Sequence, residues 1–184
     1  HGERIFINEI GAAWDLIPED LDEAFFESDI VVFGGTALVP RIHQSLTELL
    51  KKSKEKDALT IVNTVYDFLS EKKNPNEAWP LGSSPDTYPN IDLLITDREE
   101  ALRLSGKHSV EDALSFFRKR GVGGIVITHG ANPLYYAYNS PLFGVSEGSR
   151  PVSEKAREMI LHHPEMVGDT TGCGDNFAGG VIAT

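Results

Sequence analysis

The sequence has little of three things that would point to particular classes of protein. It contains a single cysteine, Cys173, which excludes a framework of internal disulfide bonds. No apolar run approaches the length of a membrane span, and the N-terminus, beginning at His1, has no signal-peptide pattern. Lys and Arg number 17 against 28 Asp and Glu, so the formal net charge is −11. We therefore expect a cytoplasmic protein with no membrane contact and no general nucleic-acid surface.

The remaining composition is that of a globular protein. At 184 residues and 40% hydrophobic, the chain is long enough for one domain with a substantial core, which we place over residues 1–184. Its one basic run, residues 51–56, is interrupted by Glu55 and closes a helical pattern. We interpret this run as favourable charge at a helix C-terminus, in preference to a phosphate-binding patch.

Four short apolar runs, each apolar on both faces, alternate with amphipathic helical patterns. This arrangement is typical of a parallel sheet covered on both sides, so we predict a doubly wound, mainly parallel α/β fold. Every run stops at glycine or at a polar residue, and in an open parallel sheet these strand ends form the ligand crevice. The runs are residues 29–33, 58–62, 91–95 and 124–127, followed by Gly34-Gly35, Asn63, Thr96-Asp97 and Thr128-His129-Gly130.

Other segments carry weaker local signals. Residues 3–10 alternate as in a strand. The spacing predicts helices over 18–28, from Pro40, over 98–104, from a cap at Ser109, and over 153–161. A hairpin is expected from 134–138 and 142–145 around Asn139-Ser140.

Two features had both a functional and a structural interpretation. The polar loop 66–89 lacks periodicity, and its Trp79 would either stack on a substrate or, as we favour, pin the loop to the core. The adjacent His162 and His163 suggest a metal site. Neighbouring positions on a helix point about 100° apart, however, so we favour solvent exposure.

The most informative stretch runs from Asp169 to Asp175 and leads into a helix. Gly172 and Gly174 lack a Cβ, so the backbone can turn sharply and approach a ligand closely. Amides at a helix start have no intrahelical partner, so the backbone of Gly172, Cys173 and Gly174 is predicted to cradle an anion. Asp175, on the first helical turn, is well placed to accept a proton from a hydroxyl that attacks a phosphoryl group.

This stretch resembles the signature of the ribokinase-like, or PfkB, carbohydrate kinases, Asp-Thr-x-Gly-Ala-Gly-Asp, with Phe177 and Gly180 at the later conserved places. Cys173 replaces the usual Ala. A dinucleotide fingerprint would need Gly where Phe177 stands, a Walker loop would need Gly-Lys-Ser/Thr, and a calcium loop would need an oxygen ligand at Cys173. The resemblance implies transfer of the γ-phosphoryl group of ATP to a sugar hydroxymethyl group, with Asp175 as the base and Gly172 to Gly174 as the anion hole.

Two further strand ends resemble the family. Residues 97–101 fall where it carries Asn-x-x-Glu-Ala, a motif associated with Mg²⁺ and the nucleotide phosphates; Glu100 is present, whereas Asp97 replaces Asn. The resemblance implies that both organise Mg²⁺ through water. Thr128 and Gly130 resemble a Thr-x-Gly strand end that lines the nucleotide site, although Pro133 replaces its second Gly. In some members, positions matching Asp169 and Thr171 bind a monovalent cation such as K⁺.

The resemblance also suggests how much of a kinase is present. A strand and turn near the sugar and lid of the family are matched by Gly2, Arg4, Phe6, Gly11 and Ala12. The resemblance therefore assigns residues 1–13 to the sugar and lid side, and it assigns residues 168–184 to the anion hole and signature helix. The groups that grip the sugar, the adenine pocket and half of the cation site have no counterpart here. By this interpretation Thr184 ends the chain in mid-helix, and the chain is an incomplete fragment that is inactive alone.

Three interpretations of function stay open. The first is a sugar kinase that uses ATP and Mg²⁺. The second is a kinase for another alcohol, such as a nucleoside or a vitamin-precursor hydroxymethyl group. The third is a non-catalytic nucleotide-binding or assembly domain, against which the intact Asp175 speaks. The expected partner is a small sugar or related alcohol; a homodimer is left open.

Overall fold

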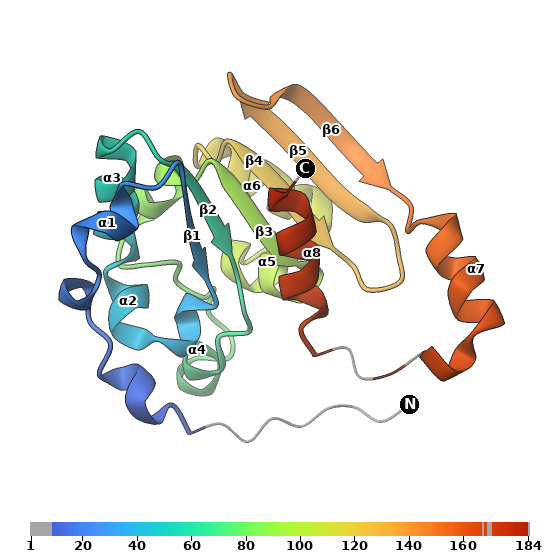
Figure 1. Ribbon diagram of the computed structural model, residues 1–184, viewed down its shortest axis with the longest axis horizontal. Helices are drawn as coiled ribbons and strands as arrows, with labels where there is room; N and C mark the ends of the chain where they lie inside the picture. The colour runs from blue at the N-terminus through green and yellow to red at the C-terminus, as the bar shows by residue number, and fades with distance from the viewer. Residues whose placement is uncertain (1–8, 167, 169–170, 184) are drawn as a thin grey trace.

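The computed structural model describes residues 9–166, 168 and 171–183, which contain one six-stranded sheet in the order β1-β2-β3-β4-β5-β6 (Figure 1). Strands β1 to β4 run parallel, and β5 and β6 are antiparallel. The predicted mainly parallel α/β fold is therefore confirmed. The strands are β1 (Ile30–Gly34), β2 (Leu59–Asn63), β3 (Leu93–Asp97), β4 (Gly124–Thr128), β5 (Leu134–Ser140) and β6 (Gly144–Arg150).

Helices connect and flank these strands. The α-helices are α1 (Glu23–Phe26), α2 (Pro40–Gln44), α3 (Leu46–Glu55), α4 (Phe68–Lys73), α5 (Arg98–Ser105), α6 (Val110–Lys119), α7 (Glu154–His162) and α8 (Cys173–Ile182). Short 3₁₀ segments are η1 (Gly11–Trp14), η2 (Pro18–Asp20), η3 (Thr36–Leu38), η4 (Pro85–Asn90) and η5 (Pro164–Met166). In the part of the chain described, no helix is both long and apolar enough to cross a bilayer.

One face of the sheet carries the main core. Alternate strand residues point to this face, where α3, α5 and α6 cover them and close the crossovers between the parallel strands (Figure 1). The predicted helical stripes are buried here, Leu46 and Leu50 from α3 and Phe117 from α6. The core members from the strands are Val31, Phe33, Val62, Leu94, Ile125 and Ile127.

The other face is covered mainly by the signature helix. Ala178 of α8 belongs to one buried cluster with Ile61, Leu93 and Ile95, so this helix packs on the middle of the sheet, mainly against β3 (Figure 1). The side chain of Val32, on the same face of β1, is 39% exposed because α8 does not reach that strand. Helices therefore lie on both faces, as predicted, but they cover the second face only in part.

The carboxyl ends of the parallel strands meet at one edge, and two helices begin there. Gly34 pairs with Asn63, and Asp97 with Thr128, so the predicted strand-end residues lie in neighbouring register. Helix α5 begins directly after Asp97, and α8 begins at the same edge (Figure 1). The sequence predicted this convergence from the polar ends of the apolar runs.

Three local predictions need correction. The segment 18–28 forms η2 and the short α1 instead of one helix, because Asp22 caps a new start by accepting a hydrogen bond from the Phe25 amide. The loop 66–89 is not irregular throughout, since it contains α4 and η4. In the hairpin, β5 continues through Asn139-Ser140, and the turn lies at 141–143 because Ser140 still pairs with Gly144.

Several sequence predictions fall on residues that lie outside the described part of the chain. These include the strand-like run before Glu9, with Gly2, Arg4 and Phe6, and the ends of the signature segment at Asp169 and Thr184. Gly11 and Ala12 are described and belong to η1.

Candidate active site

The start of α8 has the backbone geometry that the signature predicts. Gly172 is the N-cap residue with φ 77°, a left-handed conformation that favours glycine, and as a glycine it supplies no side-chain cap of its own. The amides of Cys173, Gly174 and Asp175 occupy the first turn, where an α-helix offers no backbone acceptor. A Cβ on Gly174 would meet nothing within 4 Å, so the space over this turn is open. Together these features give the start of α8, at the positive end of the helix dipole, a geometry that can hold an anion.

Asp175 stands exposed on the first turn of α8, beside the end of β2. The Asn63 side-chain amide, Nδ2, donates to Asp175 Oδ1 over 3.4 Å. The two residues are 112 positions apart in the chain, so only the fold brings them together. Asn63 was predicted to lie at this edge, but its contact with the carboxylate was not foreseen.

Asp97 and Glu100 form a capping box at the start of α5. Asp97 Oδ1 accepts from the Glu100 amide over 2.8 Å, and Glu100 Oε2 accepts from the Asp97 amide over 3.4 Å. Both residues therefore stand at the strand end where they were predicted, and both also have a structural role as the cap of α5. Asp97 is exposed, so its carboxylate also faces solvent at the edge of the sheet.

Glu100 is the buried member of this pair. Its side chain is enclosed between β2 and β3, where Oε2 accepts from Thr64 Oγ1 at 2.5 Å and from Thr96 Oγ1 at 3.5 Å. Burial, and secondarily the nearby Asp97 carboxylate, raise the pKa of Glu100 from 4.5 to about 7; the hydrogen bonds from Thr64, Asp97 and Thr96 act in the opposite direction. Glu100 thus ties α5 to the ends of two strands.

The end of β4 supplies a further part of the edge. Thr128 is half-buried and pairs with Asp97, and Gly130 follows with φ 54° in a turn closed by the Asn132 amide donating to the His129 carbonyl at 2.9 Å. The His129 Nδ1 atom is shielded from solvent and has no hydrogen-bond partner among the described residues. The two predicted nucleotide-site residues, Thr128 and Gly130, therefore flank a polar atom for which the described residues provide no hydrogen-bond partner.

Two features that had two interpretations in the sequence can be compared with the structure. Trp79 is 3% exposed and its Nε1 donates to Glu71 Oε2 at 3.1 Å, so it pins the 66–89 segment to the core as favoured. His162 and His163 are exposed, and no group of three or more His, Cys, Asp and Glu side chains able to hold a metal occurs among the residues described.

The basic run behaves as the sequence indicated. Lys52 and Lys54, at the end of α3, pair with Glu23 at 2.7 Å and with Asp92 at 2.6 Å. Their charges are therefore used in contacts within the protein.

The carboxyl edge fits a hydrated Mg²⁺ better than a dedicated metal cage. Mg²⁺ usually keeps several waters and binds one or two carboxylates together with substrate phosphates. Asp97 offers an exposed hard oxygen ligand at the edge of the sheet. Glu100 is enclosed and hydrogen-bonded, so it fits a supporting role behind Asp97 and does not fit direct ligation.

The fold defines a class, a ribokinase-like α/β protein, in which a glycine turn at the start of α8 lies at the carboxyl edge of the sheet. The match to a family is direct. The chain belongs to the pfkB family of carbohydrate kinases, which matches residues 1–184.

Solved structures with a similar fold include kinases of the ribokinase type. A ribokinase from Thermotoga maritima is similar with a TM-score of 0.65 and 20% identity, over 94% of this chain and 48% of its own. Adenosine kinase from Schistosoma mansoni, solved with adenosine and AMP, is similar with a TM-score of 0.66 and 20% identity, over 94% of this chain and 50% of its own. A protein named ribokinase II from E. coli, solved with ATP and Mg²⁺, is similar with a TM-score of 0.62 and 18% identity, over 92% of this chain and 49% of its own. The chain thus spans about half the length of each.

Proposed function

We propose that this chain is the phosphoryl-transfer part of an ATP-dependent kinase that phosphorylates the hydroxymethyl group of a sugar. The observation that carries the proposal is the start of α8, where the left-handed Gly172 turn and Asp175 share one helix end. A cradle for negative charge would serve the transferring phosphoryl group, and a carboxylate beside it would serve the attacking alcohol. Membership of the pfkB family supports this assignment.

Each residue of the cradle would have a distinct role. Asp175 would accept the proton of the acceptor hydroxyl as the oxygen attacks the γ-phosphorus atom. The amides of Gly172, Cys173 and Gly174 would donate hydrogen bonds to the charge on the transferring group. Asn63, whose Nδ2 lies 3.4 Å from Asp175 Oδ1, would hold the carboxylate toward the end of β2.

The nucleotide side of the site would lie along the ends of β3 and β4. Thr128 and Gly130 would line the nucleotide, and Asp97 would hold Mg²⁺ through water. The ion, when bound, would neutralise charge on the ATP phosphates. Glu100 would support this arrangement by fixing the Asp97 backbone through its hydrogen bond to the amide. An activating K⁺ at Asp169 and Thr171, a homodimer and a cytoplasmic location remain predictions from the sequence.

The acceptor is the least determined part of the proposal. The similar folds include a ribokinase and an adenosine kinase. A nucleoside or a vitamin-precursor alcohol therefore remains an alternative acceptor to the sugar. A coupled ADP-release screen across sugars and nucleosides, on protein from the full reading frame, distinguishes them. Acceptor-dependent ADP release would support the kinase assignment and name the acceptor class. ATP binding with no release for any acceptor would favour the non-catalytic nucleotide-binding domain.

A further inference from the structure

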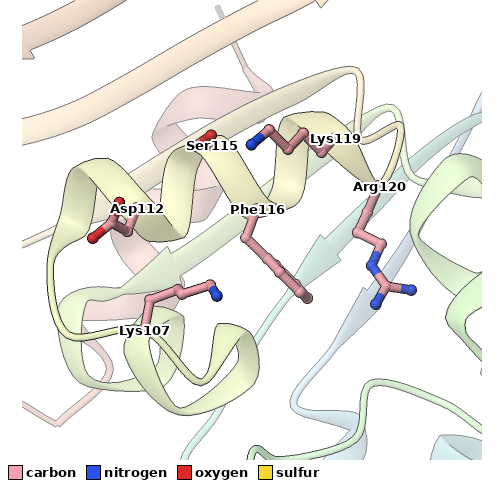
Figure 2. Close-up of a pocket in the computed structure, with 6 residues that line it drawn as sticks. All are labelled: Lys107, Asp112, Ser115, Phe116, Lys119 and Arg120. Atoms are coloured by element: carbon pink, nitrogen blue, oxygen red, sulfur yellow. The ribbon is translucent and has the colours of Figure 1, made fainter.

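A basic groove lies on the outer side of α6. Figure 2 shows its lining: side chains from α6, with Lys107 in the connection that precedes this helix. The hollow has a volume of about 560 Å³, within the range of small-molecule sites. Its lining residues are Lys107, Asp112, Ser115, Phe116, Lys119 and Arg120. Ala113 and Phe117 turn the opposite side of α6 into the core, so the groove faces away from the sheet.

The groove is positive in a protein that is strongly negative. Lys107, Lys119 and Arg120 face a single acid, Asp112, whereas the whole chain carries a formal charge of −11. Asp112 is itself engaged, because its Oδ2 accepts from Ser109 Oγ at 2.8 Å. Within the described part of the chain, no acidic side chain forms an ion pair with any of the three cations. Their charges are thus available to a ligand.

Some basic side chains elsewhere in the described part of the chain form ion pairs, and others do not. Lys52, Lys54, Arg103 and Arg118 each pair with a carboxylate of the protein. Lys72 and Lys73 on α4 likewise have no ion pair among the described residues, so the groove differs in that three unpaired cations line one hollow. Placing several such charges together costs repulsion, which a bound anion relieves.

The floor of the groove is built from packed aromatic rings. The Phe116 ring lies against Tyr88 and Phe117 at centroid distances of 5.7 and 5.4 Å. Arg120 stacks on the same ring, with its guanidinium carbon 5.2 Å from the centroid. Stacking fixes the direction of a guanidinium group, which preorganises it for an anion. Ser115 adds a hydroxyl donor to the lining.

Helix electrostatics account for only part of this cluster. Lys119 and Arg120 stand at the C-terminus of α6, where cations interact favourably with the helix dipole. Lys107 precedes α6 and points into the groove from below in Figure 2, so that effect does not explain its place. A site for a charged ligand accounts for all three.

We propose that this groove binds a small polyanion, a molecule with at least two neighbouring phosphate or carboxylate groups. Lys107 and Lys119 would take the anionic groups, Ser115 would donate a hydrogen bond, and Phe116 would support the apolar part of the molecule. The site would be separate from the cradle at α8, because none of its residues lies at the carboxyl ends of the strands. The proposal does not depend on phosphoryl transfer.

The test is a titration of the ¹⁵N-labelled 184-residue chain with sodium pyrophosphate and, in a second arm, with citrate, at constant ionic strength. Saturable shifts of the Lys107, Ser115 and Lys119 amides are expected, and the stronger of the two ligands identifies phosphate or carboxylate as the preferred group. Lys107→Ala with Lys119→Ala should weaken binding by roughly tenfold, the effect of removing two partly exposed ion pairs. The charge-preserving pair Lys107→Arg with Lys119→Arg should bind within about twofold of the parent.

The matched control removes two cations elsewhere. Lys72 and Lys73 are exposed in the last turn of α4, so Lys72→Ala with Lys73→Ala changes the net charge equally and should leave the affinity unchanged. Equal weakening in both double variants would show a nonspecific effect of net charge and would overturn the proposal. So would shifts confined to Cys173, Gly174 and Asp175, or shifts that fail to saturate with either ligand.

Discussion

Replacing the buried carboxylate of Glu100 by an amide should change how the stability of the protein depends on pH. Glu100 is 8% exposed and lies between the ends of β2 and β3, where Thr64 Oγ1 donates to it at 2.5 Å. Gln has nearly the same shape, can accept the same hydrogen bond, and serves equally well at this position of a capping box. The substitution Glu100→Gln therefore removes the titration and keeps most of the packing.

The direction follows from the pKa of Glu100, which is raised from 4.5 to about 7 by burial and by the neighbouring Asp97. As the pH rises, the unfolded chain releases this proton first, so between about 4.5 and 7 the folded state binds more protons. The free energy of unfolding must then fall as the pH rises through this window, by about 3 kcal/mol in total. Gln does not titrate, and a small part of the loss is already present at pH 5, so we expect Glu100→Gln to be more stable than the parent by about 2 kcal/mol at pH 8.

Urea unfolding of both proteins at pH 5 and pH 8, with EDTA present, measures the effect. At pH 5 the two free energies of unfolding should agree within about 1 kcal/mol; at pH 8 the variant should be more stable, with a melting temperature higher by about 5 °C. Glu99→Gln is the matched control, since Glu99 is exposed on the same turn and should leave the pH dependence unchanged. Parallel pH dependences for the parent and Glu100→Gln would refute the reasoning.

Three further predictions concern the edge of the sheet, the first two for protein from the full reading frame. Asp97→Asn keeps the helix cap and hence the thermal stability, but should raise the Mg²⁺ concentration for half-maximal activity; superimposable Mg²⁺ titrations would show that Asp97 acts only as a cap. Asn63→Ala removes the long contact to Asp175, so kcat should fall by about fivefold while KM for ATP is unchanged; an equal kcat would exclude a positioning role. The 184-residue chain alone should give no sugar-dependent ADP release, because positioning of the acceptor supplies much of the rate; release above a buffer control would contradict this.

Strands β2 to β4 were predictable because they are buried on both faces and form continuous apolar runs in the sequence, and β1 has such a run although one of its faces is partly exposed. Local chemistry also fixed two helix starts, since Ser109 accepts from the Asp112 amide and Asp97 from the Glu100 amide. The predicted position of the hairpin turn, at Asn139-Ser140, was wrong. Asn139 and Ser140 are common turn residues, but cross-strand pairing continues to Ser140 and Gly144. The only sequence signals for the turn at 141–143 are Pro141 and Gly144, whose φ is positive in the structure.

The candidate site was predictable as a set of strand and helix ends, and much less so as contacts. Gly172 and Asp175 stand where the signature places them. The contact between Asn63 and Asp175, and the bond from Thr64 to Glu100, join separate strands and helices, so no local pattern contains them. Burial of Glu100 likewise depends on how β2 packs beside β3, which composition does not reveal.

The central claim is that Asp175 is the base beside the anion cradle of α8, and one substitution tests it most directly. Asp175→Asn, in protein from the full reading frame, keeps the shape of the side chain and removes its capacity to take a proton. With the best acceptor from the ADP-release screen, kcat should fall by a factor on the order of 10² or more, while ATP affinity changes little. Turnover close to that of the parent protein would contradict the assignment.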